Sequence, residues 1–104
     1  MDKCTFCGIL SGRLPGKIVY KDELATAFQD IHPAAPTHIL IVPNKHIPSV
    51  NEIVPEDEAL IGHLFTIACQ LAESEGVDKS GYRLIINTGR DANQTIFHLH
   101  MHLI

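Results

Sequence analysis

The stretch His98-Leu99-His100-Met101-His102-Leu103-Ile104 ends the chain and places three histidines at alternate positions between apolar residues. Side chains on a β-strand alternate between its two faces. The pattern therefore predicts a strand with the histidines on one face and Leu99, Met101 and Leu103 in the core. Imidazole titrates near neutral pH and acts as nucleophile, base or metal ligand. We therefore expect this strand to carry the residues that act as nucleophile, base or metal ligand.

The spacing of the three histidines argues against one metal ion bound by all of them. His98 and His102 lie roughly 13 Å apart along a strand that rises about 3.3 Å per residue. Zinc–nitrogen bonds are only about 2.0–2.1 Å long. The row instead suits separate roles, in which one histidine attacks and another orients it or binds oxygen atoms. An edge strand with merely exposed histidines is the alternative.

The composition is that of an ordinary globular protein. The chain has 104 residues, of which 45% are hydrophobic and 19% are charged, with a formal net charge of −4. This length suits a single domain over residues 1–104. Because no basic stripe is visible, we do not expect nucleic-acid binding. Because no apolar segment reaches roughly 20 residues, we do not expect the chain to span a membrane.

The N-terminal residues and the cysteines indicate the cellular compartment of the protein. Met1-Asp2-Lys3-Cys4 lacks the apolar core of a signal peptide. Three cysteines, an odd number, argue against a disulfide framework and fit reduced thiols. We expect a soluble protein located in the cytoplasm.

Coarse patterning predicts an α+β fold with an antiparallel sheet, one long helix and a short N-terminal helix. Pro55 suits the first position of the long helix, and Gly76 ends it. Its apolar stripe is expected to contain Leu60, Leu64, Ile67, Cys69 and Leu71. The expected elements are helical turns at 4–11, strands at 17–20, 25–29, 38–42, 82–87 and 96–103, and loops at 30–36 and 88–95.

The polar loop before the histidines offers hydrogen-bond donors with only one cation, Arg90. Amide, hydroxyl and backbone groups of this kind suit a phosphate or oxyanion pocket. Stretches rich in Thr, Gly and Asn are, however, more often simple turns. The candidate residues are Asn87, Gly89, Asn93, Gln94 and Thr95.

Several segments together resemble the histidine triad (HIT) family, specifically its Hint-type nucleotide-binding branch. They are DIHPAAPTHILIVPNKH (30–46), NTG (87–89), QT (94–95) and HLHMHL (98–103), and the similarity extends from about Cys4 to Ile104. The resemblance implies a homodimeric HIT domain that hydrolyses or transfers purine nucleotides. The expected activity is hydrolysis of a nucleoside 5′-phosphoramidate derived from AMP or GMP, through a covalent nucleotidyl-histidine. The alternatives are a dinucleoside polyphosphate hydrolase and a nucleotide-binding or scaffold protein with little turnover.

The resemblance also assigns roles to the histidines. His100 matches the nucleophile that attacks the α-phosphorus. His102 and His38 match the histidines that contact phosphate and orient the nucleophile. His98 matches the first histidine of the triad, which supports the others from behind.

Further positions match groups that contact the nucleotide. Asn87, Thr95 and the backbone at Asn93, with Gln94 beside them, match the phosphate cradle, and Asp30 matches the carboxylate that holds the ribose hydroxyls. Without the resemblance, Asp30 is equally well explained as a turn former. The purine clamp is matched by Phe6, Ile9, Phe28 and Ile31.

Two departures from the family pattern stand out. Asn93 occupies a position where glycine is usual, which bears on how closely this backbone approaches phosphate. The chain also stops at Ile104, where relatives continue into a tail that crosses the dimer interface. The sequence is therefore either that of a short protein or incomplete.

Cys4 and Cys7 form a Cys-x-x-Cys pair, which is half of a tetrahedral zinc site or a pair of free thiols. Some bacterial members of the family resemble this chain in having such a pair together with a histidine that matches His46. We expect these three residues and His98 to hold a structural zinc ion. Cys69 is expected in the core, and His32 and His63 at the surface or in loops.

The resemblance, and a sheet too small to bury both of its faces, predict a twofold dimer. The expected interface pairs the long helices and the strands at Tyr82–Asn87.

Overall fold

The computed structural model describes residues 4–104. Residues 1–3, on which the expected absence of a signal peptide partly rests, lie outside the described part. The helices are α1 (Thr5–Leu10) and α2 (Glu58–Ser74). The strands are β1 (Ile18–Lys21), β2 (Ala25–Gln29), β3 (Ile39–Pro43), β4 (Leu84–Ile85) and β5 (Met101–Leu103). Three short 3₁₀ turns complete the set, at Val50–Glu52, Pro55–Asp57 and Arg90–Ala92.

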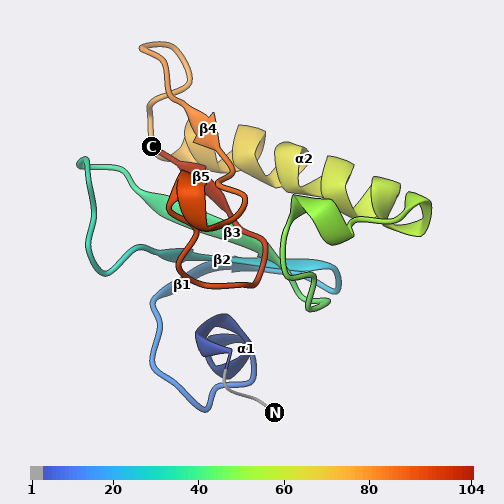
Figure 1. Ribbon diagram of the computed structural model, residues 1–104. Helices are drawn as coiled ribbons and strands as arrows, with labels where there is room; N and C mark the ends of the chain where they lie inside the picture. The colour runs from blue at the N-terminus through green and yellow to red at the C-terminus, as the bar shows by residue number, and fades with distance from the viewer. Residues whose placement is uncertain (1–3) are drawn as a thin grey trace.

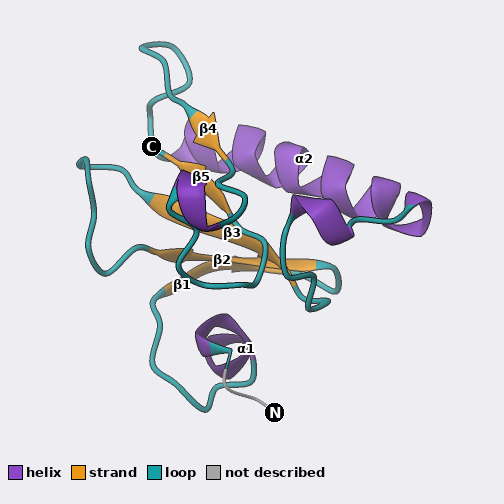
Figure 2. Ribbon diagram, viewed as in Figure 1, coloured by secondary structure: helices purple, strands orange, loops and turns teal. Residues whose placement is uncertain are grey.

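The five strands form one antiparallel sheet in the order β1-β2-β3-β5-β4. Figure 1 shows α2 packed along one side of this sheet and α1 on the opposite side. Figure 2 shows that long loops connect α1 to β1 and β2 to β3. The predicted α+β class is therefore confirmed, with one long helix and a short N-terminal helix.

The central strand β3 is buried over its whole length, and its side chains alternate between two cores. Ile39 and Ile41 belong to the larger core beneath α2. Leu40 and Val42 belong to a smaller core, which also contains Phe6 of α1. Because successive strand residues point to opposite faces, the apolar run of β3 serves both cores.

The helix α2 begins later than predicted, because Pro55–Asp57 forms a 3₁₀ turn before it. The face of α2 that packs on the sheet carries Leu64, Ile67, Ala68, Leu71 and Ala72. The expectation that Cys69 lies in the core is wrong, since its side chain is exposed. Residue 69 is two positions beyond Ile67 and so lies about 200° further around the helix.

The two strands at the end of the sheet are shorter than the predicted ranges 82–87 and 96–103. Before β5, the N–H of Leu99 donates to the carbonyl of Ile47 at 2.7 Å instead of to a neighbouring strand. The alternation nevertheless persists, because Leu99, Met101 and Leu103 are all buried in the larger core. The histidines between them therefore face the α1 side of the sheet.

None of the helices within residues 4–104 is long and apolar enough to cross a lipid bilayer.

Candidate active site

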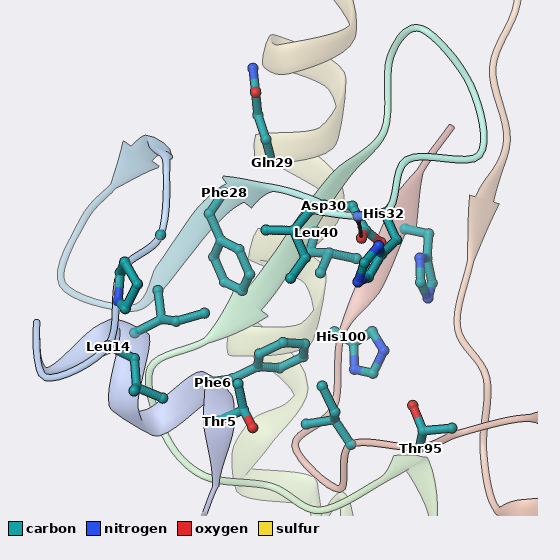
Figure 3. A pocket seen from close by; sticks show the side chains of 16 residues that line it. Thr5, Phe6, Leu14, Phe28, Gln29, Asp30, His32, Leu40, Thr95 and His100 are labelled. Atoms are coloured by element: carbon teal, nitrogen blue, oxygen red, sulfur yellow. Dashed lines mark hydrogen bonds between the residues drawn. The ribbon is translucent and has the colours of Figure 1, made fainter.

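A pocket of about 410 Å³ lies on the α1 side of the sheet. This size falls in the usual range for small-molecule sites, about 300–1,000 Å³. Figure 3 shows Leu14, Phe28 and Phe6 toward one end of the pocket, with His100, His32 and Asp30 toward the other. One end is therefore apolar, and the other carries groups that bind protons, hydroxyls or phosphate.

The strand register explains how these side chains meet. Phe28 of β2 pairs with Leu40 of β3, which in turn pairs with His102 of β5. These three residues form a row across the α1 side of the sheet. The row places an aromatic ring at one end and an imidazole at the other.

The four residues predicted to clamp the purine all line the pocket. The rings of Phe6 and Phe28 meet edge to face, with centroids 5.3 Å apart. Ile31 is 81% exposed, which places it at the rim. Ile9 completes the set, on the helix that also carries Phe6. The predicted roles of these residues remain predictions, and the structure places them around one cavity.

His100 is buried, and its ring projects into the pocket (Figure 3). Its Nδ1 lies 2.8 Å from the carbonyl oxygen of His98. Because a carbonyl only accepts hydrogen bonds, Nδ1 carries the hydrogen and Nε2 carries the lone pair. Burial lowers the pKa of His100, so the ring is neutral at neutral pH. A neutral imidazole with a free Nε2 is the form that a nucleophile requires.

His38 and His102 share a hydrogen bond of 2.9 Å between Nε2 of the first and Nδ1 of the second. The N–H of Ala34 donates to Nδ1 of His38 at 3.0 Å, so the hydrogen of His38 must be on Nε2. His38 therefore donates to His102, and His102 carries its own hydrogen on Nε2. Burial, with smaller contributions from His100 and His38, lowers the pKa of His102 to about 4.

Asp30 lies beside the same pair of histidines. Its Oδ2 lies 3.3 Å from Nε2 of His38, and its Oδ1 accepts the N–H of His32 at 2.8 Å. The remaining lone pairs of the carboxylate are available to hydroxyl groups of a ligand. Asp30 lines the pocket between the apolar wall and the histidines.

The loop before the histidines is held mainly by its own side chains. Gln94 is buried, and its amide bonds the carbonyls of Pro48 and Ile96 and the N–H of Gly89. The amide of Asn87 donates to the carbonyl of Ala92 at 2.9 Å. Of the four side chains predicted to bind phosphate, Thr95 is the one that lines the pocket.

Asn93 follows the 3₁₀ turn of this loop with a φ of 64°, in the left-handed region. Glycine adopts this conformation most easily, and asparagine is among the side chains that tolerate it best. Asparagine at position 93 is therefore compatible with the left-handed conformation of this loop.

Cys4, Cys7, His46 and His98 come together behind the histidine row, and their ligand atoms lie within 4.8 Å of one another. Nδ1 of His98 is 3.4 Å from Sγ of Cys4 and 3.5 Å from Sγ of Cys7. His46 Nδ1 lies 3.3 Å from Sγ of Cys7 and 3.2 Å from Nδ1 of His98. The structure thus gathers all four residues predicted as zinc ligands.

The spacing and the lone pairs of this cluster fit a tetrahedral metal ion. Ligand atoms around tetrahedral zinc are separated by about 3.3 Å for two nitrogens and about 3.5 Å for nitrogen and sulfur. His98 donates from Nε2 to the carbonyl of Pro43 at 2.8 Å, so its Nδ1 presents a lone pair to the cluster. The fit comes from four residues in three separate segments of the chain.

Asp30, His38 and His102 also place possible ligand atoms within 4.8 Å of one another. The two imidazole nitrogens are 2.9 Å apart and the ring centroids 5.2 Å apart, which is close to end-to-end alignment. This alignment suits a hydrogen shared between the rings. A tetrahedral metal would require the two rings to turn away from it.

A family model for the HIT domain matches residues 11–104. The chain belongs to the HIT family. It is 48% identical to the purine nucleoside phosphoramidase of Escherichia coli (strain K12) over 103 residues, which cover 99% of this chain and 87% of that protein. It is also 42% identical to an uncharacterized HIT-like protein of Synechocystis, covering 95% of this chain and 86% of that one.

Solved HIT structures have the same fold. A HIT family hydrolase from Legionella pneumophila has a TM-score of 0.96 and 40% identity, covering 98% of this chain and 91% of that one. A HIT family hydrolase from Clostridium thermocellum has a TM-score of 0.97 and 44% identity, covering 100% and 90%. The predicted family membership is therefore confirmed.

The sequence did not predict several residues that line the pocket on the α1 side of the sheet. Leu40 was identifiable, because it alternates with Ile39 and Ile41 on a fully buried strand. His32, predicted to be a loop residue, also lines the cavity. The other lining residues that were missed are Thr5, Leu14, Pro15, Gly16, Gln29 and Ile96.

His63 was predicted to lie at the surface or in a loop, and it is in fact on α2 and half-buried. Its Nε2 lies 2.7 Å from Oδ2 of Asp22, in the turn between β1 and β2. Asp22 also accepts the hydroxyl of Tyr20 at 2.6 Å. This contact ties α2 to the β1–β2 hairpin.

Proposed function

We propose that the protein is a purine nucleoside phosphoramidase, which hydrolyses the P–N bond of a nucleoside 5′-phosphoramidate derived from AMP or GMP. The observation that carries the proposal is the tautomer of His100. Its Nδ1–H donates to the carbonyl of His98, and its ring projects into the pocket with Nε2 unprotonated. The 48% identity to the phosphoramidase of Escherichia coli supports the same reaction.

The first chemical step forms a bond between Nε2 of His100 and the α-phosphorus. The bond from phosphorus to the leaving nitrogen breaks, and its electron pair goes to that nitrogen, which takes a proton from water. The imidazole becomes positively charged, and its Nδ1–H bond to the carbonyl of His98 strengthens. The Nε2–H of His102 donates to a phosphoryl oxygen and stabilises the charge that develops there.

The second step releases the product. A water oxygen attacks phosphorus, the bond to Nε2 of His100 breaks, and its electron pair returns to the ring. The water loses one proton to solvent, and a nucleoside monophosphate leaves. The ring of His100 returns to the neutral form that began the cycle.

The purine and the ribose are assigned to the remaining parts of the pocket. The apolar end, with Phe6, Ile9 and Phe28, suits a planar base, and Ile31 at the rim suits its outer face. Asp30 suits the ribose hydroxyls, because its carboxylate lies between this end and the histidines. Thr95 and the backbone near Asn93 are the proposed phosphate contacts.

The test compares substrates on the purified wild-type protein. Adenosine 5′-phosphoramidate should be hydrolysed to AMP with a higher kcat/KM than a diadenosine polyphosphate. A higher kcat/KM for the diadenosine compound would replace the proposal with a dinucleoside polyphosphate hydrolase. Tight binding of AMP without turnover of either compound would make the protein a nucleotide-binding or scaffold protein.

We also propose a structural zinc ion held by Cys4, Cys7, His46 and His98. The four ligands would close the coordination sphere, so the ion has no open position to activate water. When bound, it supplies a cross-link between the N-terminal helix and the segment before β5. The support is the spacing of the four ligand atoms and the tautomer of His98.

A twofold dimer and a cytoplasmic location complete the proposal. Phe65 on α2 is 48% exposed and β4 is an edge strand, which suits an interface that pairs both elements. Light scattering should give twice the monomer mass of 11.5 kDa, and a monomer at micromolar concentration would contradict the dimer. The cytoplasm suits zinc-binding thiols, which must stay reduced.

A further inference from the structure

Residues 4–16, here called the N-terminal arm, form a small unit that packs largely on itself. A Cβ atom added at Gly8 would lie 2.6 Å from a methyl group of Leu14, and one added at Gly16 would lie 2.6 Å from Ile9. The N–H of Leu14 also donates to the carbonyl of Gly8 at 3.0 Å. The helix, its turn and the following loop are therefore held together as one body.

This arm supplies a large part of the pocket wall. Phe6 and Ile9 come from α1, and Leu14 follows in the loop after it. The complete contribution of the arm to the lining is Thr5, Phe6, Ile9, Leu14, Pro15 and Gly16. None of these residues is part of the histidine row. Leu14 and Phe6 lie toward the end of the cavity assigned to the base (Figure 3), and the ring of Phe6 also meets that of His100 edge to face, with centroids 5.0 Å apart.

The arm is attached to the sheet by two groups of contacts. In the first group, Phe6 packs on Phe28 and the adjacent residues of the smaller core, with Ile9 and Leu10 against the same core, and its ring also meets those of His98 and His100 edge to face. The second attachment is the pair Cys4 and Cys7, whose sulfur atoms lie beside the rings of His46 and His98. Figure 1 shows α1 beyond the face of the sheet, followed by a long loop that leads to β1. A helix of six residues is not stable alone and depends on such attachments.

We infer that Cys4 and Cys7 are positioning residues for the purine: joined through a metal ion to His46 and His98, they hold the N-terminal arm as one wall of the base pocket. Nucleotide affinity therefore depends on metal occupancy, although the metal cluster and the pocket are separate sites. The inference rests on the proposed zinc site and on the proposed purine ligand.

The coupling has a direction that distinguishes it from a general loss of structure. The arm mainly forms the end of the pocket that takes the base, and it reaches the histidine row through one ring contact of Phe6 with His100, whereas Asp30 and the histidines belong to the sheet and its loops. Loss of metal should therefore weaken contacts to the purine and spare those to ribose and phosphate. By linkage, AMP should raise the affinity for zinc by the same factor by which zinc raises the affinity for AMP.

The test measures binding by titration calorimetry with AMP and with ribose 5-phosphate, which lacks the purine. The proteins are zinc-loaded wild type, wild type stripped with a chelator, Cys7→Ser, and Cys69→Ser as the matched control for loss of a thiol. Zinc removal and Cys7→Ser should each weaken AMP binding by at least about fivefold, the lower end of usual coupling factors. Ribose 5-phosphate should change by less than about twofold, and Cys69→Ser should behave as wild type.

Hydrogen exchange shows whether the arm itself responds. The amides of Gly8 and Ser11, which bond the carbonyls of Cys4 and Cys7 at 3.0 Å, should exchange faster after zinc removal. The amides of α2 should be unchanged, which would show that the sheet and its larger core remain folded.

Four results would overturn the inference, and they differ in what else they overturn. Equal AMP affinity with and without zinc removes the coupling alone. Equal weakening of AMP and ribose 5-phosphate shows that the cluster acts through the whole site and not through the base wall. A protein that binds AMP but no zinc removes the coupling and the zinc site together, and leaves the proposed hydrolysis intact. A protein that binds zinc but not AMP removes the coupling and the purine ligand.

Discussion

Two groups of histidines lie on the same side of the sheet and use the same side chain in opposite ways. In the first group, His38 and His102 share a hydrogen across 2.9 Å. In the second group, His46 and His98 bring their Nδ1 atoms to within 3.2 Å of each other, beside two thiols. One arrangement holds a hydrogen, and the other is shaped for a metal ion.

The backbone group behind each ring explains the difference. The N–H of Ala34 occupies the far nitrogen of His38, so the near nitrogen carries the hydrogen and donates. The carbonyl of Pro43 occupies the far nitrogen of His98, so its near nitrogen presents a lone pair. The carbonyl of His98 does the same to His100 and leaves Nε2 free to attack. Neighbouring backbone atoms thus select donor, ligand or nucleophile from one residue type.

Replacing the nucleophile His100, whose ring packs on that of His102 in the first group, should have the largest effect. His100→Ala should lower kcat for adenosine 5′-phosphoramidate by about 10³-fold or more, because it removes the attacking Nε2. Zinc content and melting temperature should remain close to those of wild type. The matched control is His63→Gln on α2, which should keep wild-type kcat. A rate for His100→Ala within about threefold of wild type would assign the attack to another group.

Breaking the hydrogen bond between the two rings should have a smaller effect. His38→Asn removes the donor that holds the hydrogen of His102 on Nε2, and should lower kcat by about 10- to 100-fold. KM should change less than kcat, since the lost stabilisation belongs to the transition state. Steady-state kinetics on both constants checks this expectation. An increase in KM with unchanged kcat would make His38 a binding residue.

Removing the metal tests the second group. Chelation of the wild-type protein should lower the melting temperature by several degrees. At saturating substrate and below the transition, kcat should fall by less than about twofold, because the ion activates no water. Elemental analysis of protein purified without added metal should find zinc. A content below about 0.2 zinc per chain, with both Cys4 and Cys7 alkylated in the folded state, would contradict the site.

A modest dependence of stability on pH should come from His102, a member of the first group. The pKa of His102 is lowered from 6.5 to about 4 in the folded protein. The unfolded chain therefore binds the extra proton first, and stability present above pH 6.5 is lost as the pH falls toward 4. The contribution is about 1 kcal/mol after allowance for the partial exposure of the ring.

Melting curves from pH 7 to pH 4 measure this contribution. His102→Asn should flatten the dependence relative to wild type. Met101→Leu, a change without a titrating group at the neighbouring position, should keep the wild-type slope. Equal slopes for wild type and His102→Asn would show that His102 does not titrate as the structure indicates.

The fold class could be predicted from the sequence because its strongest hydrophobic patterns are regular. The alternation at 98–103 and the apolar run at 39–42 placed their residues on the correct faces. The prediction for Cys69 was wrong because a residue two positions after Ile67 does not share the helical spacing of the apolar stripe. The start of β5 could not be predicted, because the N–H of Leu99 bonds the carbonyl of Ile47, a residue distant in sequence, instead of a neighbouring strand.

The candidate site was predicted as a set of residues but not as a set of hydrogen bonds. The resemblance supplied His100, His102 and Asp30, and the structure brings them to one pocket. The histidine tautomers depend on the N–H of Ala34 and on the carbonyls of Pro43 and His98. The positions of these backbone groups cannot be predicted from the residue types. His32 and Leu14 were missed for a similar reason, because loop conformation brings them to the cavity.

The central claim is that His100 attacks phosphorus and carries the nucleotide. The direct test is to mix the protein with adenosine 5′-phosphoramidate, quench within the first turnover, and locate any adduct by mass spectrometry of the peptides. The account predicts one adenylyl group on His100 and none in His100→Ala. An adenylyl group on a different residue, or complete turnover in one cycle with no adduct on wild type, would contradict it.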